Sequence, residues 1–253
     1  MNPIRAIVAT SAVVSIACAV LAQTVQQQAV ETEAIQPTPH KPHEPQAPAE
    51  VAEKGTLYYT LSGKEAQVLF TSKAPLENIV GKSNKVVGYA VAGPADNPAK
   101  LVAAHWVLPV ESMATGIPLR DAHMAGKEWL DGESHPTIEF KLASVEGIKE
   151  IKRGKGFSTW NATLVGDMTI RGVTRKLRVT DARLSFLDAS DRTASIAPGD
   201  LLFVKTSYAV KLSDFGMTHK DVPDKVADEI QLEQTLRLST TRQEVSANAE
   251  HNR

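Results

Sequence analysis

The amino-acid sequence predicts an all-β domain, and the clearest observation behind this prediction is the segment 164–179. Apolar and polar residues alternate there with the period of two that is typical of a strand with one buried face. The alternation breaks at Gly172 and then resumes, which predicts two antiparallel strands joined by a tight turn. The residues predicted to face inward are Leu164, Met168 and Ile170 on the first strand and Leu177 and Val179 on the second.

A single hairpin cannot bury its apolar face alone, so the domain needs further strands, and the chain contains them on both sides. Two short β-prone runs, 57–61 and 67–71, flank Ser62-Gly63-Lys64 and predict a first hairpin. Alternating or β-prone runs predict further strands within 76–91, 101–110, 137–142, 184–186, 201–210 and 230–238.

One segment has a helical period instead. Leu119, His123, Gly126 and Leu130 recur at the spacing of one helix face, and Pro118 is well placed in a first helical turn. The sequence therefore predicts one short helix. In a chain that otherwise consists of strands, we expect this helix to cover or plug one end of a barrel.

The charge balance excludes one class of partner. The chain has 28 Lys and Arg against 29 Asp and Glu, a formal net charge of -1, and its basic residues are scattered along the strands. Nucleic-acid binding needs a concentrated basic surface, so we expect no nucleic-acid partner. The length fits a single β domain with one core once both termini are set aside.

The amino terminus reads as an export signal. Residues 1–22 contain Arg5 followed by an apolar run that is short for a membrane span, which predicts a cleaved signal peptide. Cys18, the only cysteine, lies within it, so the exported protein would have no disulfide. The alternative is a lipoprotein signal with Cys18 as the lipidated residue, for which Ser15 is a poor match.

The remaining chain divides by composition. Residues 23–54 are rich in Gln and Pro with little to bury, and predict a disordered linker. Residues 55–240 hold the predicted strands and form the β domain. Residues 241–253 are polar and predict a disordered tail.

A basic segment, 147–156, has two interpretations. It predicts a turn whose positive charges are Lys149, Lys152, Arg153 and Lys155. Such a turn could make transient contact with an anionic membrane surface, or it could be an ordinary solvated hairpin tip.

The motifs of common hydrolases and redox enzymes are absent from the sequence, which has no Gly-x-Ser-x-Gly, no His-Glu-x-x-His and no Cys-x-x-Cys. We therefore expect no enzyme activity, no catalytic residue, no metal and no cofactor. Because dispersed histidines can converge in a fold, a histidine-dependent enzyme or metal site stays open as an alternative. The histidines concerned are His105, His123, His135 and His219.

Four motifs together resemble a known family. In chain order they are Arg120-Asp121-Ala122-His123-Met124, His135-Pro136-Thr137-Ile138-Glu139-Phe140, the segment from Gly166 to Arg175, and Ser213-Asp214-Phe215-Gly216-Met217. Their order and spacing resemble the YceI-like family over about 56–238. The resemblance implies an extended antiparallel lipocalin-like β-barrel of about eight strands with one short helix. It also implies export to the periplasm or beyond, and an apolar interior that binds a polyisoprenoid or another long amphiphile, a quinone included.

On this reading, inward side chains form the walls of a ligand cavity and polar ones lie at its mouth. The expected walls are Phe70, Ile138, Phe140, Met168, Ile170, Leu177, Tyr208 and Phe215. The expected polar contacts at the mouth are Arg120, Asp121, His123, Ser213 and Asp214. Each apolar residue is explained equally well by ordinary core packing, and Arg120 and Asp121 could pair for structural reasons.

The sequence therefore predicts an exported protein that holds a long-chain lipid for transport, storage or sequestration. The alternative from another class is a barrel with a packed core and no cavity, acting in protein interaction or stress response. A second copy of the chain, as a homodimer, is a further partner that the sequence allows.

Overall fold

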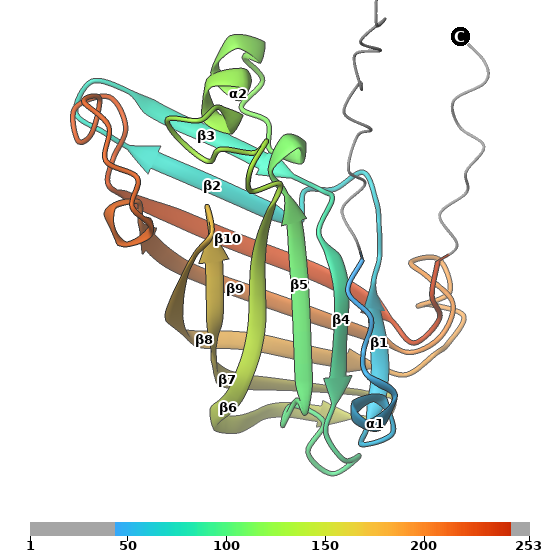
Figure 1. Ribbon diagram of the computed structural model, residues 1–253. Coiled ribbons are helices and arrows are strands. Elements are labelled where there is room, and N and C mark those ends of the chain that lie inside the picture. Colours follow the sequence, from blue (N-terminus) through green and yellow to red (C-terminus); the bar gives the residue numbers. More distant parts are fainter. Residues whose placement is uncertain (1–43, 244–253) are drawn as a thin grey trace, which may run out of the picture. The chain divides into compact units, whose positions relative to one another are not determined.

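The computed structural model describes residues 44–243 (Figure 1). The predicted signal peptide, Cys18 and most of the predicted linker lie outside the described residues, as does the tail from residue 244. None of the helices between residues 44 and 243 has both the length and the hydropathy that a membrane-spanning helix needs.

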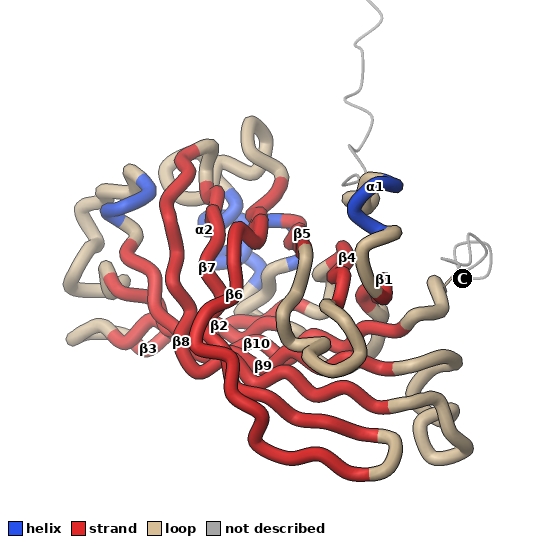
Figure 2. The backbone as a smooth tube through the Cα atoms, turned by 90° about the horizontal axis from the view of Figure 1, so that it is seen from below, coloured by secondary structure: helices blue, strands red, loops and turns tan. Residues whose placement is uncertain are grey.

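Ten antiparallel strands form one sheet, and eight of them close into a ring because the first pairs with the last. The predicted all-β, lipocalin-like barrel is therefore confirmed (Figures 1 and 2). In ring order the strands are β1 (Thr56–Thr60), β4 (Val87–Ala92), β5 (Ala103–Pro109), β6 (Thr137–Gly154), β7 (Phe157–Ile170), β8 (Val173–Leu187), β9 (Leu201–Lys211) and β10 (Glu229–Ser239).

The hairpin predicted within 164–179 is confirmed as β7 and β8. Ile170 pairs with Val173, and the two turn residues, Arg171 and Gly172, have φ values of 50° and 73°. A two-residue turn with both φ values positive matches the twist of the strands that it joins. Buried and less buried residues alternate along all of β7, as its apolar pattern requires.

Two strands extend from the ring: β2 (Val68–Lys73) pairs with β10, and β3 (Asn78–Ser83) pairs with β2. The predicted first hairpin is wrong, because β1 and β2 do not pair with each other but follow one another along the same edge of β10. Gln67 bridges the break between them. Its buried amide donates to the carbonyls of Leu61 and Val86 and accepts from the Val86 N–H, so backbone groups left unpaired at the break are satisfied.

The helix is shorter than the sequence predicts. Helix α2 (Pro118–Ala125) ends at Gly126, and Leu119, on the predicted apolar row, is 67% exposed. Leu130 is buried but lies beyond the helix. Two short 3-10 helices, η1 (Val110–Ser112) and η2 (Ser213–Phe215), follow β5 and β9.

Order begins earlier than predicted. Helix α1 (Ala49–Ala52) lies inside the predicted disordered linker. Glu44 forms an ion pair with Arg242 at 2.8 Å, and the Arg242 guanidinium lies over the Tyr59 ring. The predicted disorder is therefore wrong for residues 44–54, because contacts with the rest of the domain hold this segment in place.

Most of the predicted basic turn is also strand. β6 runs to Gly154 with three irregularities in its pairing to β7, and the turn consists only of Lys155 and Gly156. Lys152 lies over the Phe157 ring, and Arg153 lies over the Trp160 ring. These cation–π contacts hold Lys152 and Arg153 against aromatic rings of β7.

The sheet is incomplete between β8 and β9. The two strands pair only through 183–187 and 201–205. Just before this region, β8 has an irregularity in its pairing with β7, and Asp181 has a φ of 56°. A bulge bends its strand, so the first half of β8 diverges from β9.

The barrel interior differs between its two halves. In the half that holds Trp160, Leu184 and Leu202, side chains fill the space, and the rings of Tyr58 and Phe186 meet edge to face at 6.1 Å. The other half, where β5, β7 and β9 end, contains a cavity.

The packed half should carry much of the stability. We expect Leu164→Ala to lower the free energy of unfolding by about 2–5 kcal/mol, because it leaves a hole among fully buried side chains. Leu119→Ala, the matched control on exposed α2, should change it by less than about 0.5 kcal/mol. Urea denaturation followed by circular dichroism measures both, and equal losses would contradict this account.

Candidate ligand-binding cavity

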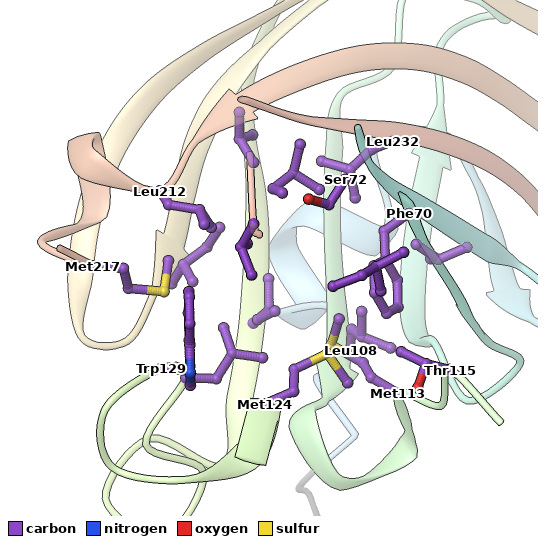
Figure 3. Close-up of a pocket in the computed structure, with 18 of the residues that line it drawn as sticks. Phe70, Ser72, Leu108, Met113, Thr115, Met124, Trp129, Leu212, Met217 and Leu232 are labelled. Carbon is purple, nitrogen blue, oxygen red and sulfur yellow. The ribbon is translucent and has the colours of Figure 1, made fainter. Parts of the chain in front are cut away.

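The cavity has a volume of about 490 Å³. Pockets that enclose most of a drug-sized ligand measure roughly 300–1,000 Å³. Strands β2, β3, β5, β6, β7, β9 and β10 contribute its walls, and α2, the loops on either side of it and the loop that precedes β10 contribute its mouth. Figure 3 shows how side chains such as Phe70, Leu108, Met124 and Leu232 surround it.

Six of the eight predicted wall residues line this cavity: Phe70, Ile138, Phe140, Met168, Ile170 and Tyr208. Leu177 and Phe215 do not. They line a second hollow of about 270 Å³ beside the gap between β8 and β9. Alternation along a strand predicts which side chains point inward, but it does not predict where two strands separate.

The predicted mouth residues also divide. Arg120 and His123 line the cavity, whereas Asp214 lines the second hollow. Asp121 instead accepts hydrogen bonds from the Thr115 N–H and hydroxyl at 2.7 and 2.6 Å, which lower the pKa of its carboxyl. Ser213 donates through its N–H and its hydroxyl to the Asp228 carboxylate.

The charges at the mouth are paired with one another. Arg120 of α2 bonds Glu77 at 2.8 Å, which ties the helix to the β2–β3 hairpin. Lys225 lies 3.4 Å from Asp221. Each pair joins one positive and one negative charge, so together they give the mouth little net charge.

Sequence reasoning missed the wall residues that come from loops and α2. Four of the five methionines in the chain line the cavity, and the fifth, Met1, lies outside the described residues. Methionine is flexible and polarisable, so it adapts to irregular apolar surfaces. The four are Met113, Met124, Met168 and Met217. Met168 was among the predicted walls, but the other three come from α2 and from loops, where no alternation marks a side chain as inward.

Polar groups lie on the floor of the cavity. Tyr208 and Gln234 are the innermost lining residues on β9 and β10. Burial raises the pKa of the Tyr208 phenol, so it stays protonated and able to donate. Gln234 was missed although the sequence offers a signal, because it interrupts an inward face that is otherwise Ile230, Leu232, Leu236 and Leu238.

The four domain histidines have separate surroundings. His105 Nε2 lies 3.0 Å from Glu139 Oε2 in the barrel wall, and His219 contacts Glu128 and packs at a tilt against the Trp129 ring. His123 lines the cavity, and His135 lies beside Gly172. Within residues 44–243 no three metal-ligating side chains gather into a candidate metal site.

His105 should make stability depend on pH. Burial is the largest influence and lowers its pKa, although the hydrogen bond to Glu139 opposes the shift. Below the ordinary value of 6.5, the unfolded chain therefore binds a proton that the folded chain does not bind until a lower pH. Stability is then lost as pH falls through this window, and His105→Gln should make the fall shallower. Urea unfolding at several pH values measures the slopes, and identical slopes would contradict the assignment.

Comparison with known proteins agrees with this architecture. The family model for the YceI-like domain matches residues 59–238. The search of curated proteins found no match. Among solved structures, Burkholderia cenocepacia BcnA is similar with a TM-score of 0.51 and 19% identity, over 68% of this chain and 95% of that one.

Two further solved structures have lower TM-scores. A polyisoprenoid binding domain from Saccharophagus degradans has a TM-score of 0.48 and 12% identity, over 74% of this chain and 99% of that one. A Campylobacter jejuni YceI protein has a TM-score of 0.46 and 14% identity, over 77% and 97%. Because the family model matches most of the chain, the protein belongs to the YceI-like domain family.

Proposed function

We propose that the protein binds a long-chain lipid, a polyisoprenoid or a similar amphiphile such as an isoprenoid quinone, and holds it for transport, storage or sequestration. The observation that carries this proposal is the cavity of about 490 Å³ in one half of the barrel. Its walls are mostly aliphatic, aromatic and methionine side chains, among them Phe70, Leu108, Ile138 and Met168.

The physical basis of binding is burial of apolar surface, which stabilises a complex by about 25 cal/mol per Å² removed from water. An isoprenoid chain is branched and irregular, and methionines can adjust to it better than rigid side chains. The cavity also makes a fully packed interaction barrel the weaker alternative. The proposal involves no covalent chemistry.

The direction of ligand entry follows from the position of the mouth. α2 and the β2–β3 hairpin border the mouth, whereas the basic stretch of β6 near Arg153 lies at the opposite end of its strand. A membrane contact through that basic stretch would turn the mouth away from the bilayer. We therefore propose that ligand exchange occurs at the α2 end, in the exported protein that the predicted signal peptide implies.

The direct test is to purify the full-length gene product gently after export and to analyse its organic extract by mass spectrometry. We expect a long-chain lipid in stoichiometric amount. Lipid-free protein that also fails to bind added polyisoprenoid alcohols would overturn the proposal.

A second test fills the cavity. Ile138→Trp places a bulky ring among the lining side chains of β6 and should reduce lipid retention at least tenfold with the barrel intact. Lys141→Trp, on the exposed face of the same strand, is the matched control and should retain lipid normally. Retention is measured by mass spectrometry and folding by circular dichroism. Equal retention by both variants would contradict a ligand in this cavity.

A further inference from the structure

We propose that the floor of the cavity is a recognition site for the uncharged polar group of the ligand, formed by the Tyr208 hydroxyl and the Gln234 side-chain amide. The inference deepens the proposed function and rests on it. It assigns the ligand to isoprenoids that carry an alcohol, carbonyl or ether oxygen, and it disfavours phosphorylated ones. It also sets the orientation, with the polar group inside and the hydrocarbon toward the mouth.

The first argument is the position of the two residues. On β9 and β10, Tyr208 pairs with Leu232, and Thr206 pairs with Gln234. Tyr208 and Gln234 are therefore diagonal neighbours on the inward face, a spacing that aromatic and long side chains can span. Both residues line the cavity. Leu236, which is the next inward residue after Gln234, does not line it, and neither does Thr206.

The second argument is unused hydrogen-bonding capacity. The Tyr208 hydroxyl makes no hydrogen bond to any residue in the range 44–243. The Gln234 oxygen accepts from the Thr206 hydroxyl at 3.3 Å, while its NH₂ group has no acceptor in the same range. A third lining residue, Trp106, has a buried ring N–H without a partner in the same range. Polar groups that face an apolar cavity cost free energy when they have no partner. The oxygen atoms of a ligand would supply acceptors for these donors.

The third argument concerns the mouth. Its Arg and Lys side chains, Arg120 and Lys225, are paired with Glu77 and Asp221, and the one other basic residue among the lining residues is His123. Two exposed aliphatic residues also line the mouth: Leu119 at 67% and Ile117 at 47%. Such residues suit an emerging hydrocarbon tail better than a charged headgroup. Inside, an unpaired phosphate would lose its hydration without a compensating cation.

The test compares three probes that share one isoprenoid chain: geranylgeraniol, its monophosphate, and the matching hydrocarbon without oxygen. Binding to the full-length protein is followed through tryptophan fluorescence, because Trp106 and Trp129 line the cavity. We expect the alcohol to bind most tightly. Tyr208→Phe, Gln234→Leu and the double variant should each lower the ratio of alcohol affinity to hydrocarbon affinity, by roughly threefold to tenfold for each hydrogen bond removed.

Hydrocarbon binding serves as the internal control, since it reports an intact cavity in each variant. An alcohol-to-hydrocarbon affinity ratio that is the same in wild type and in the double variant would overturn this inference and leave the proposed function standing. Monophosphate binding at least as tight as alcohol binding would also overturn it. Failure of wild type to bind any of the three probes would overturn the proposed function together with the inference.

Discussion

The architecture depends on the edge of β10, which needs a hydrogen-bonding partner along its whole length. One side pairs continuously with β9, and the other is shared between β2 and β1, with Gln67 at the break. Where β1 occupies the edge, the chain continues through β4 to β5 and the ring closes tightly over a packed core. Where β2 occupies it, β3 joins no further strand of the ring, and the loop before α2 meets it through the single bridge between Lys82 and Ala114. The cavity lies at this wider end because closure there is made by loops and a helix, which leave space between them.

Local patterns predicted those parts of the fold that local physics determines. The β7–β8 hairpin followed from strict alternation and a turn with suitable residues, and six wall residues followed from the same rule. The predicted hairpin of β1 and β2 is wrong because each of these strands pairs with β10, which is distant in the sequence, and not with the other. The prediction of disorder is wrong for residues 44–54 because they contact residues that are far away in the sequence. One such contact is the ion pair between Glu44 and Arg242. Alternation marks a side chain as inward, but an inward Met168 looks the same in a sequence whether it meets another side chain or empty space.

The polarity of the cavity runs opposite to the simplest expectation, which places polar contacts at the mouth and apolar ones inside. Two of the five predicted mouth residues line the cavity, and one of these, Arg120, is held by Glu77. Spare hydrogen-bonding capacity is found instead on the floor, at Tyr208 and Gln234, and at the buried ring N–H of Trp106 in the wall. Gln234 interrupts the apolar inward face of its strand, and this interruption was the feature of the sequence that indicated a polar group in the cavity. A polar side chain turned toward an apolar cavity costs free energy unless it finds a hydrogen-bonding partner.

Where β8 separates from β9, the facing edges of these two strands do not pair with each other, and the wall of the barrel has a gap. Free edges of this kind can recruit strands from other molecules and start fibrous assembly. Here the open stretch of β8 carries Arg175, Lys176 and Arg178, and the facing end of β9 carries Lys211. Lys176 and Arg178 are paired with Asp167 and Glu146, so Arg175 and Lys211 would be the charges that repel a second identical edge. Positive charges at the opening thus disfavour the pairing of a second strand with these edges, so the wall of the barrel can contain a gap.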